Sequence, residues 1–466
     1  MPATRDTRAQ AAAEGSPDRL SLQGMPSTLT LVTDARVAAA DTLADLRTGL
    51  LLDAAFDRRA AELDSRDRRW TQELVWGMLR KRGWIDHLLA PRVRGGLARL
   101  DADLADLLRL GVHQLFHMGS VPAYAAIAQT VELAKQRHGM GASRLANAVL
   151  RRLDRERETL GADLPTDPVE ALAVEYSHPR WLVARWVARW GADETRALLE
   201  ANNREAPLIV RPWGVVREQL EAMLETSGVG VTDAPLVEDS MLLAPGTVIT
   251  SVGAFQQGLC FVQDPAATLV TRYAAIPIGA QVADLCAAPG GKSVELSRTA
   301  AHVTAADSSE TRLTRLIETI ERLGLDNVDP AMADARDGTL GEFDAVLVDA
   351  PCTGTGTFRR HPDARWRLRT SDLAVMAAAQ RAVLRGAAKC VMPGGLLIYS
   401  TCSLEPEEND VQVGSFLADH AGWTLEPPPE GTVPDAVLDA GRLRVLPQRH
   451  GTDGSFAARL RRGVEA

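Results

Sequence analysis

The second half of the chain alternates apolar strand-like runs with helix-like runs, and this pattern limits the fold more than any other feature of the sequence. From about residue 279, four strand candidates are each followed by a helix candidate: 281–286 by 292–299, 302–307 by 310–323, 343–349 by 371–391, and 396–401 by 407–420. Such alternation predicts an α/β fold with a Rossmann-like, doubly wound and mostly parallel sheet. Ligands of such sheets bind at the carboxyl ends of the strands.

Residues 31–160 follow a different pattern, because apolar residues recur there at helical spacing between turn signals, which predicts an all-α bundle. The segment 29–160 holds 21 Lys and Arg against 17 Asp and Glu, although the whole chain has a net charge of -9. Its cation clusters at residues 66–69, 80–82 and 151–152 fit either a solvated helix face or a surface that contacts phosphates. Binding of nucleic acid would then be local, despite the acidity of the chain.

We divide the chain into a disordered tail (1–30), a helical domain (31–160), a linker with a small α/β subdomain (161–262) and an α/β domain (263–466). In the subdomain we expect strands at 208–212 and 247–250, and we expect Trp186 in the core. The tail has no apolar core and is not a signal peptide. No apolar run reaches the roughly 18–20 residues of a membrane helix. We therefore expect a cytoplasmic protein with no membrane partner.

The five cysteines are odd in number and widely spaced, which argues against a disulfide framework. They also lack the close pairs of a structural zinc site, so we expect no metal. Cys260 and Cys390 are expected to be packing residues. Cys352 and Cys402 directly follow strand candidates, where loop tips are exposed and a thiol near a helix N-terminus can act as a nucleophile.

The first strand of the α/β domain runs into the string Asp284-Leu-Cys-Ala-Ala-Pro-Gly-Gly-Lys292. Small residues let the backbone approach a ligand, and a helix N-terminus presents free N–H groups. The string matches neither G-x-G-x-x-G nor the phosphate loop, which disfavours NAD and ATP as ligands. The alternative to a nucleotide-binding loop is a tight strand–helix turn that binds no ligand. Asp307 ends the next strand, where an acid takes ribose hydroxyls, and Asp334 follows the strand after it. Together these residues predict an adenosine-bearing cofactor.

The strings DLCAAPGGK, DAPC and STCS, in this order, resemble the S-adenosylmethionine-dependent RNA (cytosine-5) methyltransferases of the NOL/NSUN/Sun family. The string TGTGTFRRHPDARW resembles their bacterial ribosomal-RNA branch, and the helical domain is similar to the RNA-binding bundle of NusB. The combination resembles the RsmB (Sun/Fmu) type and covers nearly everything after residue 30. It implies S-adenosylmethionine as cofactor, 16S rRNA as partner, and cytosine 967 in the usual 16S numbering as target. We expect the protein to be a monomer.

The resemblance also implies a role for each matching residue. Asp307 would hold the ribose, Asp334 would lie by the adenine, and Asp349 would lie between cofactor and target base. Cys402 would be the nucleophile, and Cys352 would help product release. The cofactor loop would consist of Cys286, Ala287, Ala288, Pro289, Gly290, Gly291 and Lys292.

The chemistry explains why such residues are needed, because C5 of cytosine is a poor nucleophile. Addition of the Cys402 thiolate to C6 would turn C5 into a carbon able to attack a methyl sulfonium. Asp349 would serve as base or stabilise the charge that builds at N3 and the amino group, and Cys352 would assist loss of the C5 proton. The target base must be unstacked to reach the site.

A cationic string follows the second cysteine motif, and we expect it to hold RNA phosphates, with a solvated loop as the alternative. It includes Arg359, Arg360, His361, Arg365 and Arg367.

Two other functions stay open. One is an RNA-binding assembly factor with a vestigial methylation site, which the intact cysteine pair disfavours. The other is a tRNA cytosine-5 methyltransferase, which the NusB-like bundle disfavours.

Overall fold

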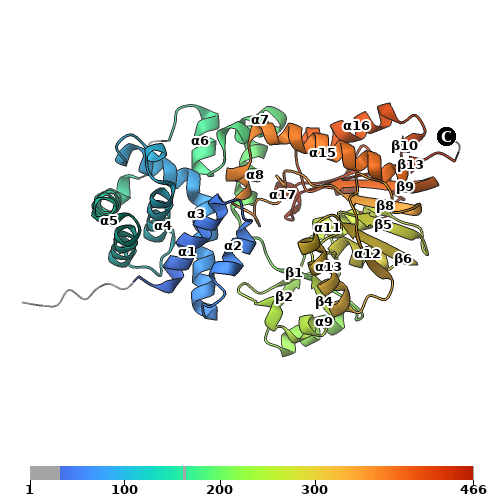
Figure 1. Ribbon diagram of the computed structural model, residues 1–466, viewed down its shortest axis with the longest axis horizontal. Coiled ribbons are helices and arrows are strands. Elements are labelled where there is room, and N and C mark those ends of the chain that lie inside the picture. Colours follow the sequence, from blue (N-terminus) through green and yellow to red (C-terminus); the bar gives the residue numbers. More distant parts are fainter. Residues whose placement is uncertain (1–31, 161–163, 465–466) are drawn as a thin grey trace, which may run out of the picture.

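The structure is a computed structural model that describes residues 32–160 and 164–464. The disordered tail predicted at residues 1–30 lies outside the described residues. A helical bundle comes first along the chain, a small mixed α/β unit follows, and a large sheet flanked by helices comes last (Figure 1).

The bundle is all-α, as the helical spacing predicts. Asp64 and Asp101 begin its third and fourth helices, because their carboxylates accept hydrogen bonds from free backbone amides of the first turn. Gly139 has a φ of +80° inside the last helix, so two helical segments meet there. Leucine-rich faces of these helices pack into one core. The helices are α1 (Asp34–Arg47), α2 (Leu52–Arg59), α3 (Ser65–Leu89), α4 (Ala102–His117) and α5 (Ala123–Arg155).

The small unit combines five helices with a four-stranded antiparallel sheet of order β2-β3-β1-β4. Trp186 is buried among its helices, as predicted. The strand predicted at 247–250 is wrong: residues Ile249–Ser251 form a 3-10 turn instead. The elements are α6 (Pro168–Glu175), α7 (Arg180–Trp190), α8 (Ala192–Asn203), β1 (Ile209–Pro212), α9 (Arg217–Thr226), β2 (Val231–Asp233), β3 (Met241–Leu243), α10 (Gly253–Gln256) and β4 (Cys260–Val262).

The large sheet follows the order β11-β12-β13-β9-β8-β5-β6-β7, and β10 pairs with β13. Five neighbouring strands are parallel, namely β7, β6, β5, β8 and β9 in sheet order. Strands β10 to β13 add an antiparallel edge beyond β9. Its strands are β5 (Gln281–Leu285), β6 (His302–Asp307), β7 (Val328–Met332), β8 (Phe343–Asp349), β9 (Val391–Thr401), β10 (Trp423–Leu425), β11 (Leu438–Asp439), β12 (Arg442–Val445) and β13 (Ser455–Arg462). The helices are α11 (Pro265–Ala274), α12 (Gly291–Ser297), α13 (Glu310–Leu323), α14 (Ala364–Arg367), α15 (Thr370–Lys389), α16 (Asp410–Asp419) and α17 (Pro447–His450).

Successive residues of each central strand face opposite sides of this sheet, because side chains alternate along a strand. Val282 packs with the layer that contains α11, α12 and α13, whereas Ala283 packs with the layer that contains α15 and α16 (Figure 1). Burial on both faces explains why these strands are continuously apolar rather than alternating. The sheet is therefore doubly wound.

The strand order reverses between β5 and β8, since β6 and β7 lie on one side of β5 and β8 and β9 on the other. In doubly wound sheets the ligand crevice lies beyond the carboxyl ends of the strands at such a point. None of the described helices is both long and apolar enough to span a membrane. The domain boundaries at residues 160 and 262 stay predictions.

Candidate active site

Three neighbouring loops meet at the carboxyl edge of the large sheet. The cofactor-loop candidate follows β5, the loop with Cys352 follows β8, and the loop with Cys402 follows β9. Because these three strands are adjacent and parallel, the loops that leave them lie side by side. The structure thus brings Cys352, Cys402, Asp349 and Lys292 together at one place.

The two cysteines face each other, with 3.3 Å between their Sγ atoms. Contact with Cys402 and burial raise the pKa of the Cys352 thiol well above its ordinary value. Cys352 therefore keeps its proton, and either sulfur can be the donor of the hydrogen bond between them.

Asp349, the last residue of β8, is held on both carboxylate oxygens. Lys292 Nζ lies 2.6 Å from Oδ2, and the Ser400 hydroxyl donates to Oδ1 at 2.8 Å. Although burial opposes its charge, the nearby Asp349 carboxylate raises the pKa of Lys292 above its ordinary value. Lys292 also lies near enough to Cys402 for that sulfur's charge to favour the ammonium. A fixed cation therefore stands between a carboxylate and the candidate nucleophile.

Glu408 joins the two cysteine loops, and the sequence analysis missed it. Its buried carboxylate accepts hydrogen bonds from the backbone amide of Thr353 at 2.9 Å, from the Thr353 hydroxyl and from the Ser403 hydroxyl. Gln380 on α15 donates to it at 2.9 Å. Thr353 and Ser403 each follow one of the cysteines directly. The string Glu405-Pro-Glu-Glu-Asn409 after the second cysteine was the available signal, since it places several polar residues beside a buried strand end.

A pocket of about 300 Å³ adjoins Asp349 and Lys292 and is lined by most of the predicted cofactor loop. Gly290 turns the chain with a φ of +105°, and a side chain there would meet Leu316 at 2.7 Å. Burial raises the pKa of Asp284, at the pocket wall, to about 7. One oxygen of Asp284 and one of Asp307 are buried without a hydrogen-bond partner among the described residues. Unpartnered acceptors next to a small-residue loop fit a ligand that brings hydroxyl or ammonium donors.

The two other predicted cofactor acids differ in their surroundings. Asp307 is the last residue of β6. One of its carboxylate oxygens accepts a hydrogen bond from the Ser309 amide and pairs with Arg312, which leaves the other oxygen for a ligand. Asp334 follows β7, and Arg336 engages both of its carboxylate oxygens. Asp334 thus has a partner within its own loop.

The predicted phosphate-binding string is mostly internal, which corrects that prediction. Arg365 is fully buried and donates to Asn203 and to backbone carbonyls. Arg359 is buried, and Asp264 and Asp453 bind both Arg359 and Arg360. Guanidinium groups that are already paired with carboxylates inside the protein are not free for phosphates. His361 remains half-exposed, and exposed Arg367 pairs with Asp363.

The remaining cysteines lack the features of a nucleophile. Burial raises the pKa of Cys260 to about 11, that of Cys286 to about 12, and that of Cys390 above its ordinary value. All three thiols therefore stay protonated. Cys260 and Cys390 are packing residues, as predicted.

Three family models match the chain in the order of its structural parts. The NusB family matches residues 33–155, and an RsmF/B-like ferredoxin-like domain matches residues 178–250. The family described as 16S rRNA methyltransferase RsmB/F matches residues 278–461, which include the whole cysteine site.

Curated relatives resemble the chain over most of its length. It is 35% identical to the ribosomal RNA small subunit methyltransferase B of Pseudomonas syringae, over 91% of this chain and 96% of the relative. It is 34% identical to the probable ribosomal RNA small subunit methyltransferase B of Bacillus subtilis, over 87% and 92%. The solved structure of the protein PH0851 is 28% identical, with a TM-score of 0.76 over 92% of this chain and 99% of that one. The chain belongs to the RsmB/F family of 16S rRNA methyltransferases.

Proposed function

We propose that the protein transfers a methyl group from S-adenosylmethionine to C5 of a cytosine in 16S rRNA through a covalent bond between Cys402 and C6. The observation that carries this proposal is the pair of sulfurs 3.3 Å apart, beside Asp349 and a small-residue pocket. A paired thiol, a fixed carboxylate and a cofactor pocket are what covalent activation of cytosine requires.

Cys286 to Lys292, Asp284 and Asp307 would hold S-adenosylmethionine, which supplies the methyl group as an electrophile. The buried free oxygen of Asp307 suits a ribose hydroxyl, and that of Asp284 suits an ammonium or hydroxyl donor. Asp334 is proposed on the adenine side by resemblance alone, since Arg336 engages its carboxylate.

Addition of the Cys402 sulfur to C6 moves electron density onto C5 and toward N3, so that C5 can take the methyl group. Asp349 accepts a hydrogen bond from the amino group of cytosine. Lys292, 2.6 Å from Asp349, places a positive charge where negative charge develops. The hydrogen bond from the Ser400 hydroxyl holds the Asp349 carboxylate in a fixed orientation.

Release requires that the C5 proton goes to a base and that the electron pair of the C6–sulfur bond returns to Cys402. Contact with Cys402 is the largest cause of the raised pKa of Cys352. Once Cys402 is bonded to C6 it carries no charge, so this cause of the raised pKa of Cys352 is removed while burial still acts. We propose that the Cys352 thiol then gives its proton to water. The resulting thiolate then takes the C5 proton.

By resemblance, the target is cytosine 967 in the usual 16S numbering. We also propose that the enzyme acts as a monomer in the cytoplasm, where this substrate is found. The test is incubation of the full chain with tritiated S-adenosylmethionine and unmethylated 16S rRNA or tRNA. Bisulfite sequencing then locates the mark. We expect label in a single 16S cytosine. Label in tRNA would reassign the substrate, and no transfer to either RNA would contradict the proposal.

A further inference from the structure

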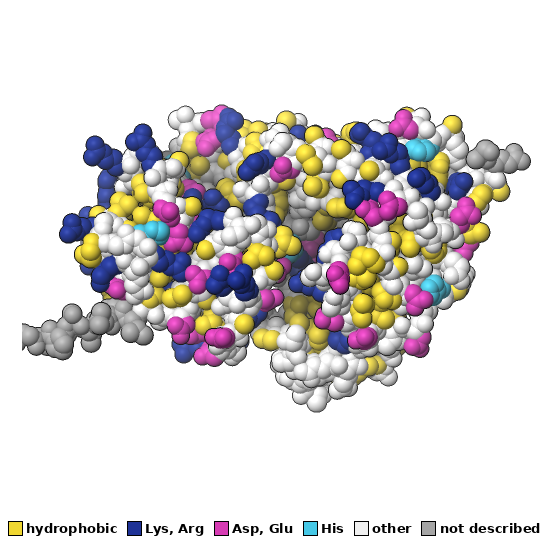
Figure 2. All heavy atoms as spheres, viewed as in Figure 1, with side chains coloured by type: hydrophobic (Ala, Val, Ile, Leu, Met, Phe, Trp, Pro, Cys, Tyr) yellow, Lys and Arg dark blue, Asp and Glu magenta, His cyan; other side chains and the backbone are white. Residues whose placement is uncertain are grey.

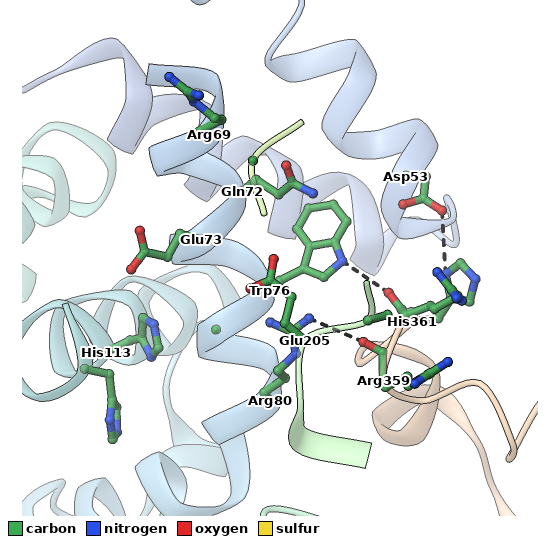
Figure 3. Close-up of a pocket in the computed structure, with 15 residues that line it drawn as sticks. Asp53, Arg69, Gln72, Glu73, Trp76, Arg80, His113, Glu205, Arg359 and His361 are labelled. Carbon is green, nitrogen blue, oxygen red and sulfur yellow. Dashed lines mark hydrogen bonds and ion pairs between the residues drawn. The ribbon is translucent and has the colours of Figure 1, made fainter. Parts of the chain in front are cut away.

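A second pocket, of about 640 Å³, lies where the helical bundle meets the loop that follows β8 (Figure 3). Trp76 of α3 donates from its indole N–H to the carbonyl of Arg360, and Arg80 donates to the carbonyl of Arg359. These two contacts fix the pocket against the loop that also carries Cys352. In space-filling view, this face of the molecule is hollowed at its centre, between the bundle and the large sheet, and Lys and Arg side chains lie along the hollow (Figure 2). The size of the pocket suits a nucleotide.

One face of α3 supplies most of the pocket wall. Its members recur every three or four residues, so they form a stripe about 16 Å long. An amphipathic helix normally buries such a stripe in a core, but here it is largely polar. The stripe comprises Arg69, Gln72, Glu73, Trp76, Gly77 and Arg80.

The cations of this stripe form no ion pair with an acidic side chain in the described part of the chain, although Glu205 lies near enough to Arg80 to favour its charge. Arg69 is exposed and makes no hydrogen bond or ion pair with the described residues. Arg80 bonds only to a neutral carbonyl, and its Nε is buried without a partner in the described part of the chain. Burial also lowers the pKa of Arg80. The guanidinium of Arg69 and the donors of Arg80 that the Arg359 carbonyl does not use are therefore available to an anion.

The pocket also presents groups that suit a nucleobase. Gln72, Glu73 and Glu205 line it without hydrogen bonds to the described residues. Amide and carboxylate groups read the edges of unpaired bases, whereas arginines hold phosphates. The floor is His113, whose pKa burial lowers to about 3, so it is a neutral imidazole. The remaining acid, Asp53, faces His361 at 3.6 Å.

Arg360 lines both this pocket and the pocket beside Asp349 and Lys292, so the two pockets are neighbours. An RNA strand that lies along the hollow between the bundle and the large sheet would bring the nucleotides next to its target base to this pocket (Figure 2).

We propose that this junction pocket binds a nucleotide of the RNA strand next to the flipped cytosine, with its phosphate on Arg69 and Arg80 and its base against Gln72 and Glu73. The inference rests on the proposed function and adds to it a substrate-positioning site contributed by the helical bundle. Arg69 and Gln72 are positioning residues, since they lie away from the reacting atoms.

The test uses the full chain, unmethylated 16S rRNA and four single variants. Arg69→Ala and Gln72→Ala alter exposed side chains, so neither is expected to disturb folding, and Arg69→Lys restores the charge. Arg381→Ala is the matched control, because Arg381 is likewise exposed and unpaired in the described part of the chain, but on α15. We measure KM and kcat at saturating S-adenosylmethionine, RNA affinity against salt, and amide hydrogen exchange of α3.

For Arg69→Ala we expect KM for RNA to rise about tenfold with kcat nearly unchanged, and the salt slope of binding to fall by about one. We expect Arg69→Lys to recover most of the affinity, and RNA to protect α3 from exchange. If both alanine variants match Arg381→Ala and RNA leaves α3 exchange unchanged while wild type methylates 16S rRNA, this inference is overturned and the proposed function stands. If wild type does not methylate 16S rRNA, both fall.

Discussion

The Sγ atoms of Cys352 and Cys402 lie 3.3 Å apart, although 50 residues separate them in the chain. Adjacent parallel strands β8 and β9 deliver them to the same edge, where contact with Cys402 raises the pKa of the Cys352 thiol. In the proposed reaction, Cys402 attacks the base and Cys352 holds its proton until Cys402 has reacted.

Glu408 sets the distance between the two cysteine loops, so Glu408→Gln is expected to misplace both. The amide keeps the size of the side chain but cannot accept from every donor that now binds the carboxylate. We expect kcat to fall by up to about 100-fold while KM for S-adenosylmethionine changes little. Glu407→Gln is the control, since Glu407 bonds to Arg185 at the surface. Equal kcat for the two variants would remove the positioning role of Glu408.

Lys292 is expected to be needed for chemistry rather than for folding. Lys292→Met removes the positive charge beside Asp349, and we expect kcat to fall by about 100-fold or more. The control is Lys389→Met, an exposed lysine at the end of α15. Thermal melting should show both variants folded. A Lys292→Met enzyme with more than half of the wild-type kcat would refute the electrostatic role.

Asp284 makes the stability of the ligand-free protein depend on pH. Its pKa rises from 3.8 to about 7 on folding, because burial disfavours the charged form. Between about pH 4 and pH 7 the folded state therefore holds a proton that the unfolded state releases, and stability falls as pH rises. The Asp284→Asn variant has no carboxyl group at this position, so its stability does not fall in this way as pH rises. We expect its Tm to match wild type near pH 4 and to exceed it by a few degrees at pH 8, and a constant difference across this range would contradict the assignment.

Much of the central sheet could be predicted from the sequence. The strands 302–307 and 343–349 and the helix 310–323 match the structure to the residue, because an apolar block with clear polar ends is a local signal. The antiparallel strands β10 to β13 could not be predicted in this way. Three of them have two to four residues, and they are defined by pairing with β13 (β10 and β12) or with β12 (β11), while β13 pairs with β9.

The candidate site, like the sheet, could be predicted from the sequence only in part. The cysteine motifs and Asp349 could be found locally, since each follows an apolar strand. The pairing of Arg359 and Arg360 inside the protein could not be predicted from the sequence, because their partners Asp264 and Asp453 lie more than 90 residues away. Glu408 was missed for a related reason: its function depends on Thr353 in another loop, 55 residues away.

The central claim is that Cys402 bonds to the target base and that Cys352 releases it. The most direct measurement is to incubate the full-length Cys352→Ala variant with unmethylated 16S rRNA and S-adenosylmethionine, then to separate it on a denaturing gel. After nuclease digestion, mass spectrometry of the retained adduct identifies the modified peptide. We predict a stable adduct whose nucleotide is on Cys402, and none with Cys352→Ala/Cys402→Ala or with Cys390→Ala. An adduct on another residue, or normal turnover by Cys352→Ala without an adduct, would contradict this account.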